Sequence, residues 1–256
     1  MLLRSLLPSL ALLLVCAPAR ADFVAGKIVL DGREVTVSWN DGDSFSFKQG
    51  KGRRKRARLL DVNTLENFGP VHRWGTWNAW ELYVLSDEAA KVAAAKAWKC
   101  TSSESPDGYG RLLVRCPDLA RELVKQGQAM VFAVDAPPAK DLVALQADAQ
   151  KRKAGIWLKG VPPLLISSAH SVLEGKGYNR VVDTRTGKAS VVEHEEAFET
   201  CDQVCTGTGP DASCLLFVPF KRRYTDPPPC VTDPKVLPRP PRVVDPRLKQ
   251  EPAKPK

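Results

Sequence analysis

The chain has 256 residues, of which 43% are hydrophobic and 26% are charged, and its formal net charge is +9 at pH 7. These proportions exclude a chain without a hydrophobic core, and the length allows one domain with extensions or two small domains. The basic charge favours nucleic acid, acidic polymers or anionic surfaces as partners, but it identifies none of them.

Residues 1–21 have the pattern of a cleaved secretory signal peptide. Arg4 supplies the positive start, residues 5–15 are leucine-rich, and Ala19-Arg20-Ala21 is a small-x-small cleavage site. The apolar run is shorter than the ~20 residues that a transmembrane helix needs. We therefore expect a secreted or periplasmic monomer with no membrane span, whose mature chain starts near Asp22.

Six cysteines remain once the signal peptide is removed. An even number of cysteines in an exported chain indicates disulfides. Zinc is the alternative, but the Cys201-x-x-x-Cys205 spacing does not match a zinc knuckle and no histidine pair lies near it. We therefore expect disulfides among Cys100, Cys116, Cys201, Cys205, Cys214 and Cys230.

The first part of the mature chain is predicted to form strands. Apolar and polar residues alternate through much of residues 23–47, with turn signals at Asp31-Gly32 and Asn40-Asp41-Gly42. Lysine and arginine then dominate residues 48–58. This basic run is either a solvated hairpin loop or a patch that attracts phosphate groups, and both interpretations stay open.

Aromatic residues recur at a spacing of three after this run, at Trp74, Trp77, Trp80 and Tyr83. They could stack on bases, but this spacing is more often the buried face of a helix, so we expect them in the core. A capping residue and two acids at residues 86–88 predict the start of a helix with an alanine-rich body.

Two strands and two further helices are predicted downstream. The strands cover residues 98–101 and 112–116, which places Cys100 and Cys116 on neighbouring strands and predicts a disulfide between them. Helices are expected at residues 118–126 and 141–153, with an apolar strand between them. Strands followed by helices indicate an α+β fold or a small barrel with helices on one side.

Five motifs occur in order over residues 27–158: Asp41-Gly42-Asp43-Ser44, Arg58 to Glu66, Asp107-x-Tyr109-Gly110-Arg111, Leu123 to Gly127, and Gly155-Ile156-Trp157. Each motif is weak alone. With all five motifs present in this order, the chain resembles the staphylococcal nuclease-like (thermonuclease) family. The resemblance implies an α+β domain over residues 22–159, built as an OB-type five-stranded β-barrel with three helices.

The resemblance also implies a site that cleaves phosphodiester bonds. Arg58 and Arg111 would contact the phosphate, and Glu66 would orient or deprotonate the attacking water. The chemistry suits these residue types, because hydrolysis places extra negative charge on the phosphoryl oxygens and planar guanidinium groups stabilise that charge. Arg58, Glu66 and Arg111 are therefore the predicted catalytic residues.

The implied cofactor is Ca²⁺, with Asp43, Asn63 and the carbonyl of Thr64 as its protein ligands. The family has aspartate where this chain has Asn63 and proline where it has Leu65. Since Ca²⁺ affinity depends on charged ligands, we expect a weakened site. In a continuous strand Asp61 would face the same side as Asn63, so compensation by Asp61 is a further hypothesis.

Two function classes follow. The first is a secreted endonuclease that hydrolyses DNA and RNA with Ca²⁺ assistance. The second is a catalytically weakened or inactive nuclease-like OB-fold protein that keeps the basic residues and binds nucleic acid.

The remainder of the chain lies outside the resemblance. Residues 160–230 are expected to form a small Cys-rich β module with two disulfides, for which three pairings are open. Residues 231–256 are rich in proline and lysine, which predicts a disordered tail. We expect a solvated loop for His72, no partner pattern for His170, and an acidic surface turn around His194.

Overall fold

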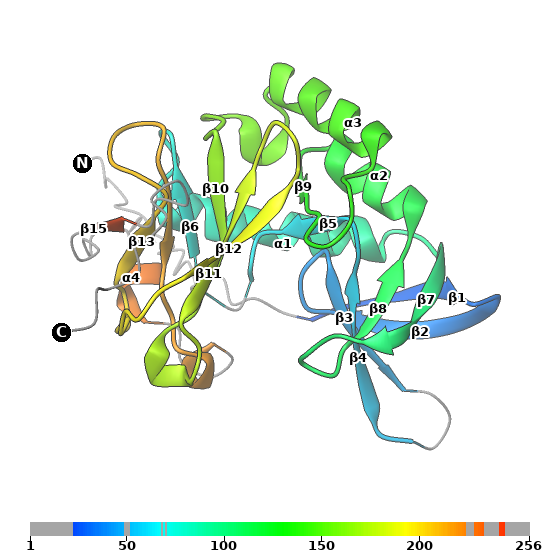
Figure 1. The fold of residues 1–256 in the computed structure, drawn as a ribbon. Helices are drawn as coiled ribbons and strands as arrows, with labels where there is room; N and C mark the ends of the chain where they lie inside the picture. Colours follow the sequence, from blue (N-terminus) through cyan, green and yellow to red (C-terminus); the bar gives the residue numbers. More distant parts are fainter. Residues whose placement is uncertain are drawn as a thin grey trace, which may run out of the picture.

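The computed structural model describes residues 23–48, 52–67, 69, 71–223, 228–232 and 241–243. Figure 1 shows a barrel with helices above it on one side of the molecule and a group of sheets from the C-terminal half on the other. The predicted signal peptide lies outside the described residues. Within those residues, no helix is both long and apolar enough to cross a membrane.

Six strands close into the barrel. They are β1 (Val24–Leu30), β2 (Arg33–Trp39), β3 (Ser44–Lys48), β4 (Arg54–Leu59), β8 (Leu112–Arg115) and β7 (Trp98–Pro106), in that order around the barrel. The first four pair antiparallel, whereas β4–β8 and β1–β7 are parallel. The predicted OB-type α+β fold is confirmed, but the closed sheet has six strands where the prediction had five.

Three helices accompany the barrel as predicted: α1 (Ala79–Ala94), α2 (Pro117–Lys125) and α3 (Lys140–Lys151). The predicted start of the first helix was wrong. Asn78 caps it, because the Asn78 side chain accepts a hydrogen bond from the Glu81 backbone N–H at 2.8 Å and the Glu81 carboxylate accepts one from the Asn78 backbone N–H. Ser86 lies within the helix, where its hydroxyl donates to the carbonyl of Tyr83.

The aromatic series belongs to the core, as expected. Trp74 and Tyr83 are buried, and the partly buried Trp77 and Trp80 pack against buried apolar clusters. The Trp77 indole donates to the carbonyl of Ile156 in the short helix η1 (Gly155–Trp157), at 2.9 Å. These side chains hold α1 against the segment that closes the nuclease-like part of the sequence.

The C-terminal module, residues 160–243 as far as they are described, contains two sheets. One has the order β10 (Leu164–Ala169), β11 (Tyr178–Asp183), β12 (Ala189–Glu193). The other has the order β15 (Pro241–Val243), β13 (Gln203–Cys205), β14 (Ser213–Leu216), β6 (Val71–Trp74). The last strand comes from far upstream, so the two parts predicted as separate domains share a sheet.

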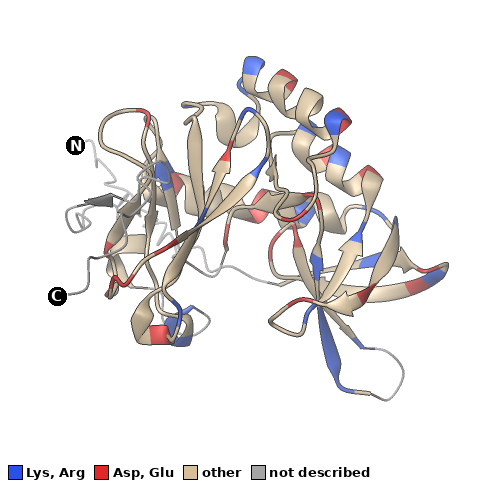
Figure 2. Ribbon diagram, viewed as in Figure 1, with Lys and Arg blue, Asp and Glu red and all other residues tan. Residues whose placement is uncertain are grey.

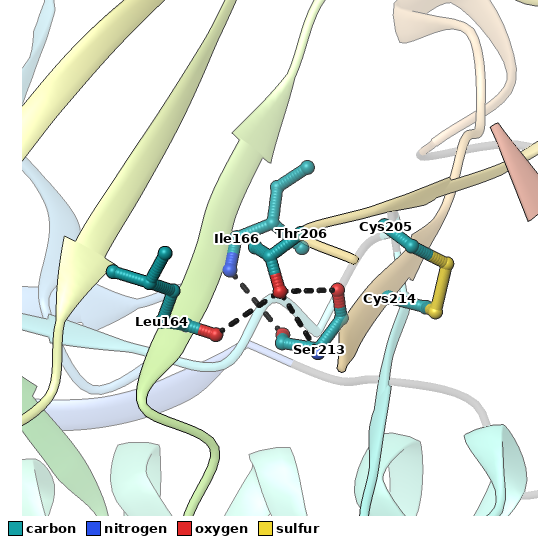
Figure 3. Close-up of a disulfide and its surroundings, with 6 residues drawn as sticks. All are labelled: Leu164, Ile166, Cys205, Thr206, Ser213 and Cys214. Atoms are coloured by element: carbon teal, nitrogen blue, oxygen red, sulfur yellow. Dashed lines mark hydrogen bonds between the residues drawn. A yellow bond between two sulfur atoms is a disulfide. The ribbon is translucent and has the colours of Figure 1, made fainter. Parts of the chain in front are cut away.

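All three disulfides are formed. Cys100 and Cys116 are paired as predicted, and the other two pairs are Cys201–Cys230 and Cys205–Cys214. Figure 3 shows how the last pair lies beside the contact between the two C-terminal sheets. There the Ser213 hydroxyl accepts a hydrogen bond from the Ile166 backbone N–H at 3.2 Å.

Several local expectations differ from the structure. Pro241–Val243, within the segment predicted to be a disordered tail, pairs parallel with β13. Two histidines expected at the surface are buried instead: His72 is only 1% exposed in β6, and His194 is 7% exposed. His72 is buried because β6 pairs with β14 and is also covered by α1. The expected β structure of residues 160–230 includes an antiparallel hairpin formed by β11 and β12.

Candidate active site

The Asp41-Gly42-Asp43 turn connects β2 and β3 and is closed by a hydrogen bond from the Asn40 N–H to the Ser44 carbonyl. Gly42 is required there, because a Cβ atom at this position would come within 2.6 Å of the Ala89 Cβ in α1. Asp43 is buried, and its Oδ2 accepts a hydrogen bond from the Thr64 backbone N–H at 2.7 Å. The turn therefore ties the barrel to α1 and to the short strand β5 (Val62–Thr64).

Arg58 lies in β4 and joins two of the predicted site residues. Its Nη1 donates to Asp43 Oδ1 at 2.9 Å, and its Nη2 donates to Asn63 Oδ1 at 2.6 Å. Burial alone would lower the pKa of Arg58, but Asp43 and Glu66 outweigh that effect and raise it. The guanidinium is therefore held rigidly, with its charge balanced by surrounding carboxylates.

The predicted Ca²⁺ ligands are brought together, but in an arrangement that does not fit the ion. Asp43 is the only carboxylate among them, and its oxygens already accept from Arg58 and the Thr64 N–H. The Asn63 amide accepts from Arg58 and donates to the Thr64 carbonyl at 2.6 Å. In the described part of the chain, no group of three or more His, Cys, Asp or Glu side chains is placed to hold a metal.

The hypothesis that Asp61 compensates for Asn63 is wrong. It assumed a continuous strand, whereas Asp61 has a φ of +71° and turns the chain between β4 and β5. Its carboxylate faces away, toward Arg115, and accepts from that side chain at 2.7 and 3.2 Å. The charge of Asp61 is thus used in an ion pair on another part of the surface.

Glu66 follows β5 in a segment anchored by its neighbour. Leu65, which stands where the family has proline, is 2% exposed and packs with Met130 and Trp157. Burial and the nearby Asp43 raise the pKa of Glu66, and Arg223, Arg58 and Arg111 oppose this rise. A partly exposed carboxylate with a raised pKa is a stronger base than an ordinary glutamate, which suits it to accept a proton.

Asp41 is a buried acid that the sequence-based set of site residues did not include. Burial raises its pKa well above the usual range, and Asp43 and Glu66 raise it further. Its place in the Asp-Gly-Asp motif was visible in the sequence, but its burial was not. The site therefore concentrates three acidic residues around the part-buried guanidinium of Arg58.

Arg111 lies at the end of a tight loop between β7 and β8. Asp107 organises this loop, because its carboxylate accepts from the backbone N–H groups of Tyr109 and Arg111 and from Arg111 Nε, all at 2.8–2.9 Å. Partial burial would raise the pKa of Asp107, but the hydrogen bonds from Arg111 outweigh it and lower the pKa. Arg56, from the basic run, donates to the Tyr109 carbonyl at 2.9 Å.

The basic run itself supports the phosphate-attracting interpretation only in part. Its described residues include the exposed Arg54, Lys55 and Arg56 on β4, and Figure 2 shows this part of β4 in blue. Arg56 connects it to the loop that carries Arg111. The run is thus both a solvated hairpin and a neighbour of the candidate site.

Sequence reasoning gave no indication that Arg223 influences Glu66. Arg223 lies beyond η3 (Phe220–Arg222), in the C-terminal module, yet its charge lowers the pKa of Glu66 more than those of Arg58 and Arg111 do. No motif surrounds it, and its sequence distance from Glu66 gave no signal. Only the packing of the module against the barrel reveals it.

Residues 56–159 match the family model described as staphylococcal nuclease homologue. This match includes Arg58, Glu66 and Arg111, and it begins after Asp43. No curated protein matches the chain.

Proposed function

We propose that this chain is an exported endonuclease that hydrolyses phosphodiester bonds of DNA and RNA, because residues 56–159 match the staphylococcal nuclease homologue family. The family supports a nuclease-like protein. The three disulfides are in keeping with an oxidising compartment outside the cytosol, either extracellular or periplasmic.

The observation that carries this proposal is the placement of Arg58 and Arg111 on neighbouring strands: β4 pairs parallel with β8, and Arg58 lies opposite Leu113, two residues after Arg111. The charges of both arginines also lower the pKa of Glu66. In the proposed reaction Glu66 accepts a proton from water as the water oxygen attacks phosphorus. The P–O bond to the leaving oxygen then breaks, and that oxygen leaves with the electron pair and takes up a proton from solvent. The two guanidinium groups stabilise the negative charge that develops on the phosphoryl oxygens, and this stabilisation is greater in the transition state than in the substrate.

Ca²⁺ is the cofactor that the family implies, since the family is generally Ca²⁺-dependent. When bound, the ion would add positive charge next to the phosphate. Its predicted ligands are Asp43, Asn63 and Thr64, whose oxygens instead accept hydrogen bonds within the protein.

The same arrangement favours a second candidate function. Arg58 bridges Asp43 and Asn63, so its positive charge already balances the carboxylate that a cation would use. A protein arranged in this way can bind phosphate groups through its arginines without cleaving them. The second candidate is therefore a weakened or inactive nuclease-like OB-fold protein that binds nucleic acid.

Digestion of single-stranded DNA and RNA distinguishes the two functions. We expect cleavage by the wild-type protein and a loss of about 10²–10⁴-fold in Glu66→Gln, because that variant lacks the base but keeps the shape of the side chain. Asp118→Asn, on the exposed face of α2, is the matched control. If the wild-type protein binds nucleic acid in a salt-dependent way but does not cleave it, the protein is a nucleic-acid-binding protein and not an endonuclease.

Ca²⁺ dependence is tested separately, with added Ca²⁺ and with EDTA, in the wild type and in Asn63→Asp. The substitution removes the donor to the Thr64 carbonyl and adds a second carboxylate. If the site is a weakened Ca²⁺ site, Asn63→Asp should bind Ca²⁺ more tightly and cleave faster when Ca²⁺ is present. Equal rates in both media for both proteins would contradict Ca²⁺ assistance.

A further inference from the structure

The C-terminal module touches the loop that carries Arg111. The hydroxyl groups of Tyr109, in that loop, and Tyr178, at the start of β11, are 2.6 Å apart. The Tyr109 ring also has two cations near it: Lys176 Nζ is 4.0 Å from its centroid and the Arg111 guanidinium carbon is 5.3 Å away. A basic residue of the module and a predicted catalytic arginine therefore share one aromatic ring.

A continuous sheet fixes the module in this position. β14 pairs antiparallel with β6, which begins five residues after Glu66, and the pairing runs from Ser213↔Trp74 to Leu216↔Val71. Arg223 follows β14 and is anchored by a hydrogen bond from its Nε to the Val218 carbonyl at 3.0 Å. Its effect on the pKa of Glu66 agrees with a position close to the site.

Three cations of the module are placed near this contact by their neighbours: Lys176, Arg180 and Arg223. Lys176 and Arg180 lie beside the Tyr109 and Tyr178 rings, and Arg223 lies over the Phe220 ring, whose backbone N–H donates to Glu174, two residues before Lys176. All three act on His170, and together with burial they lower its pKa to about 3, so His170 is neutral at physiological pH. Among the residues that the structure describes, none of the three forms a salt bridge with a carboxylate. Glu174, in the adjoining turn η2 (Val172–Glu174), accepts instead from the Phe220 N–H.

Such a group of unneutralised cations repels itself in the folded protein, and a polyanion that bound there would relieve the repulsion. Tyr178 adds an aromatic surface to the group. The centroid of its ring lies 4.4 Å from the centroid of the His170 ring and 5.0 Å from the guanidinium carbon of Arg180. Cations beside a partly exposed aromatic ring are the combination that binds single-stranded nucleic acid.

We propose that Lys176, Arg180 and Arg223 bind phosphate groups of the same nucleic-acid strand that Arg58 and Arg111 hold, so that the C-terminal module extends the substrate site beyond the barrel. Tyr178 lies where a base of that strand would stack. The ligand class is a single strand of DNA or RNA. This inference rests on the proposed function for the identity of the ligand, although binding does not require cleavage.

The test measures binding in a Glu66→Gln background, so that cleavage does not interfere. A labelled single-stranded DNA oligonucleotide is titrated at several salt concentrations with the Lys176→Gln/Arg180→Gln double variant. Each phosphate contact on a single strand contributes about 0.7 to the slope of log K against log salt, so losing two should lower the slope by about 1.4 and weaken binding roughly 20-fold at 0.1 M salt.

The matched control is Arg185→Gln/Lys188→Gln, which removes the same charge from exposed positions beyond the other end of β11. We expect its slope to stay close to that of the parent. Arg223→Gln, a second and independent variant, should lower the slope by about 0.7. Circular dichroism melting curves verify that each variant is folded.

The outcomes separate this inference from the proposed function. Loss of binding in the Lys176/Arg180 and Arg223 variants supports the extended site, whether or not the wild-type protein cleaves DNA. Slopes equal to those of the Arg185/Lys188 control, in variants that are folded, overturn it even if cleavage is rapid. Binding that none of these substitutions weakens would confine the nucleic-acid site to the barrel.

Discussion

The barrel and the C-terminal module are stabilised in different ways. The barrel encloses one large apolar core, to which α1 and α2 contribute, and it has one disulfide. The module has two smaller apolar clusters and two disulfides, and one of its sheets includes a strand from the nuclease-like part of the chain. A small module with little core of its own typically depends on disulfides and on contact with a larger partner.

The difference indicates that the module is a dependent part of the structure. β6 and α1 supply Val71 and Tyr83 to the cluster that contains Leu216 and Val218. In the other direction, Leu165 and Val182 of the module pack into the cluster around Trp157. The candidate site lies close to this shared boundary, with Glu66 only five residues before β6.

The largest expected effect comes from ending the chain after Val161. This truncation removes β14 from β6 and leaves the buried Trp74 and Val71 exposed, so we expect no cooperative thermal unfolding and no nuclease activity. Removing residues 244–256, which lie outside the described residues, is the control. A truncated chain that unfolds cooperatively would show that the barrel is an independent domain.

Arg58→Gln and Arg111→Gln should differ in their effects on stability. Each should reduce the rate of cleavage by about 10²–10³-fold, because each removes a donor to the phosphate. Arg58→Gln should also reduce the free energy of unfolding by about 3–5 kcal/mol, since it leaves the buried Asp43 without its partner. Urea unfolding and initial rates measure the two effects, with Arg33→Gln, at an exposed position of β2, as control. Equal losses of stability in both variants would contradict the buried role of Arg58.

The pH dependence should reveal the contribution of the module to the site. Glu66 acts as a base only when ionised, and its pKa lies above the usual 4.5, so the acid limb of kcat/KM should lie above that pH. Arg223 lowers this pKa, and Arg223→Gln should therefore move the limb to higher pH. An unchanged limb in the variant would mean that the charge of Arg223 does not reach Glu66.

The raised pKa of Glu66 and that of Asp41 also predict how stability depends on pH: stability should fall as the pH rises, whereas activity should increase. Carboxyl groups whose pKa is raised by folding, here Asp41 and Glu66, hold their protons more tightly in the folded state. Their contribution to stability is therefore largest below the pKa of the unfolded chain and is lost as the pH rises through the folded pKa. Activity should thus increase over the pH range in which these two groups weaken the fold.

The smallest expected effect is that of Asp61→Asn. It breaks a partly exposed ion pair with Arg115, which typically changes stability by no more than about 1 kcal/mol. Since Asp61 faces away from Asn63, Ca²⁺ affinity and nuclease activity should be unchanged. A loss of either would restore the hypothesis that Asp61 supports the metal site.

The sequence by itself determined the local features of the barrel. Alternating residues predicted its first strands, and the order of the motifs predicted an OB-type fold with Arg58 and Glu66 near one another. Pairing of Cys100 with Cys116 followed from their neighbouring strands. These features depend on contacts that are close in sequence, or on a pattern that recurs throughout a family, so residue types and spacing are sufficient to infer them.

Only the tertiary structure decided how the site is completed. The alternation rule placed Asp61 beside Asn63, but one residue with a positive φ turned it toward Arg115. The place of β6 in a sheet of the C-terminal module and the approach of Arg223 to Glu66 arise from contacts between distant segments. Such contacts depend on shape and packing across the whole molecule, which the spacing of residues along the chain does not record.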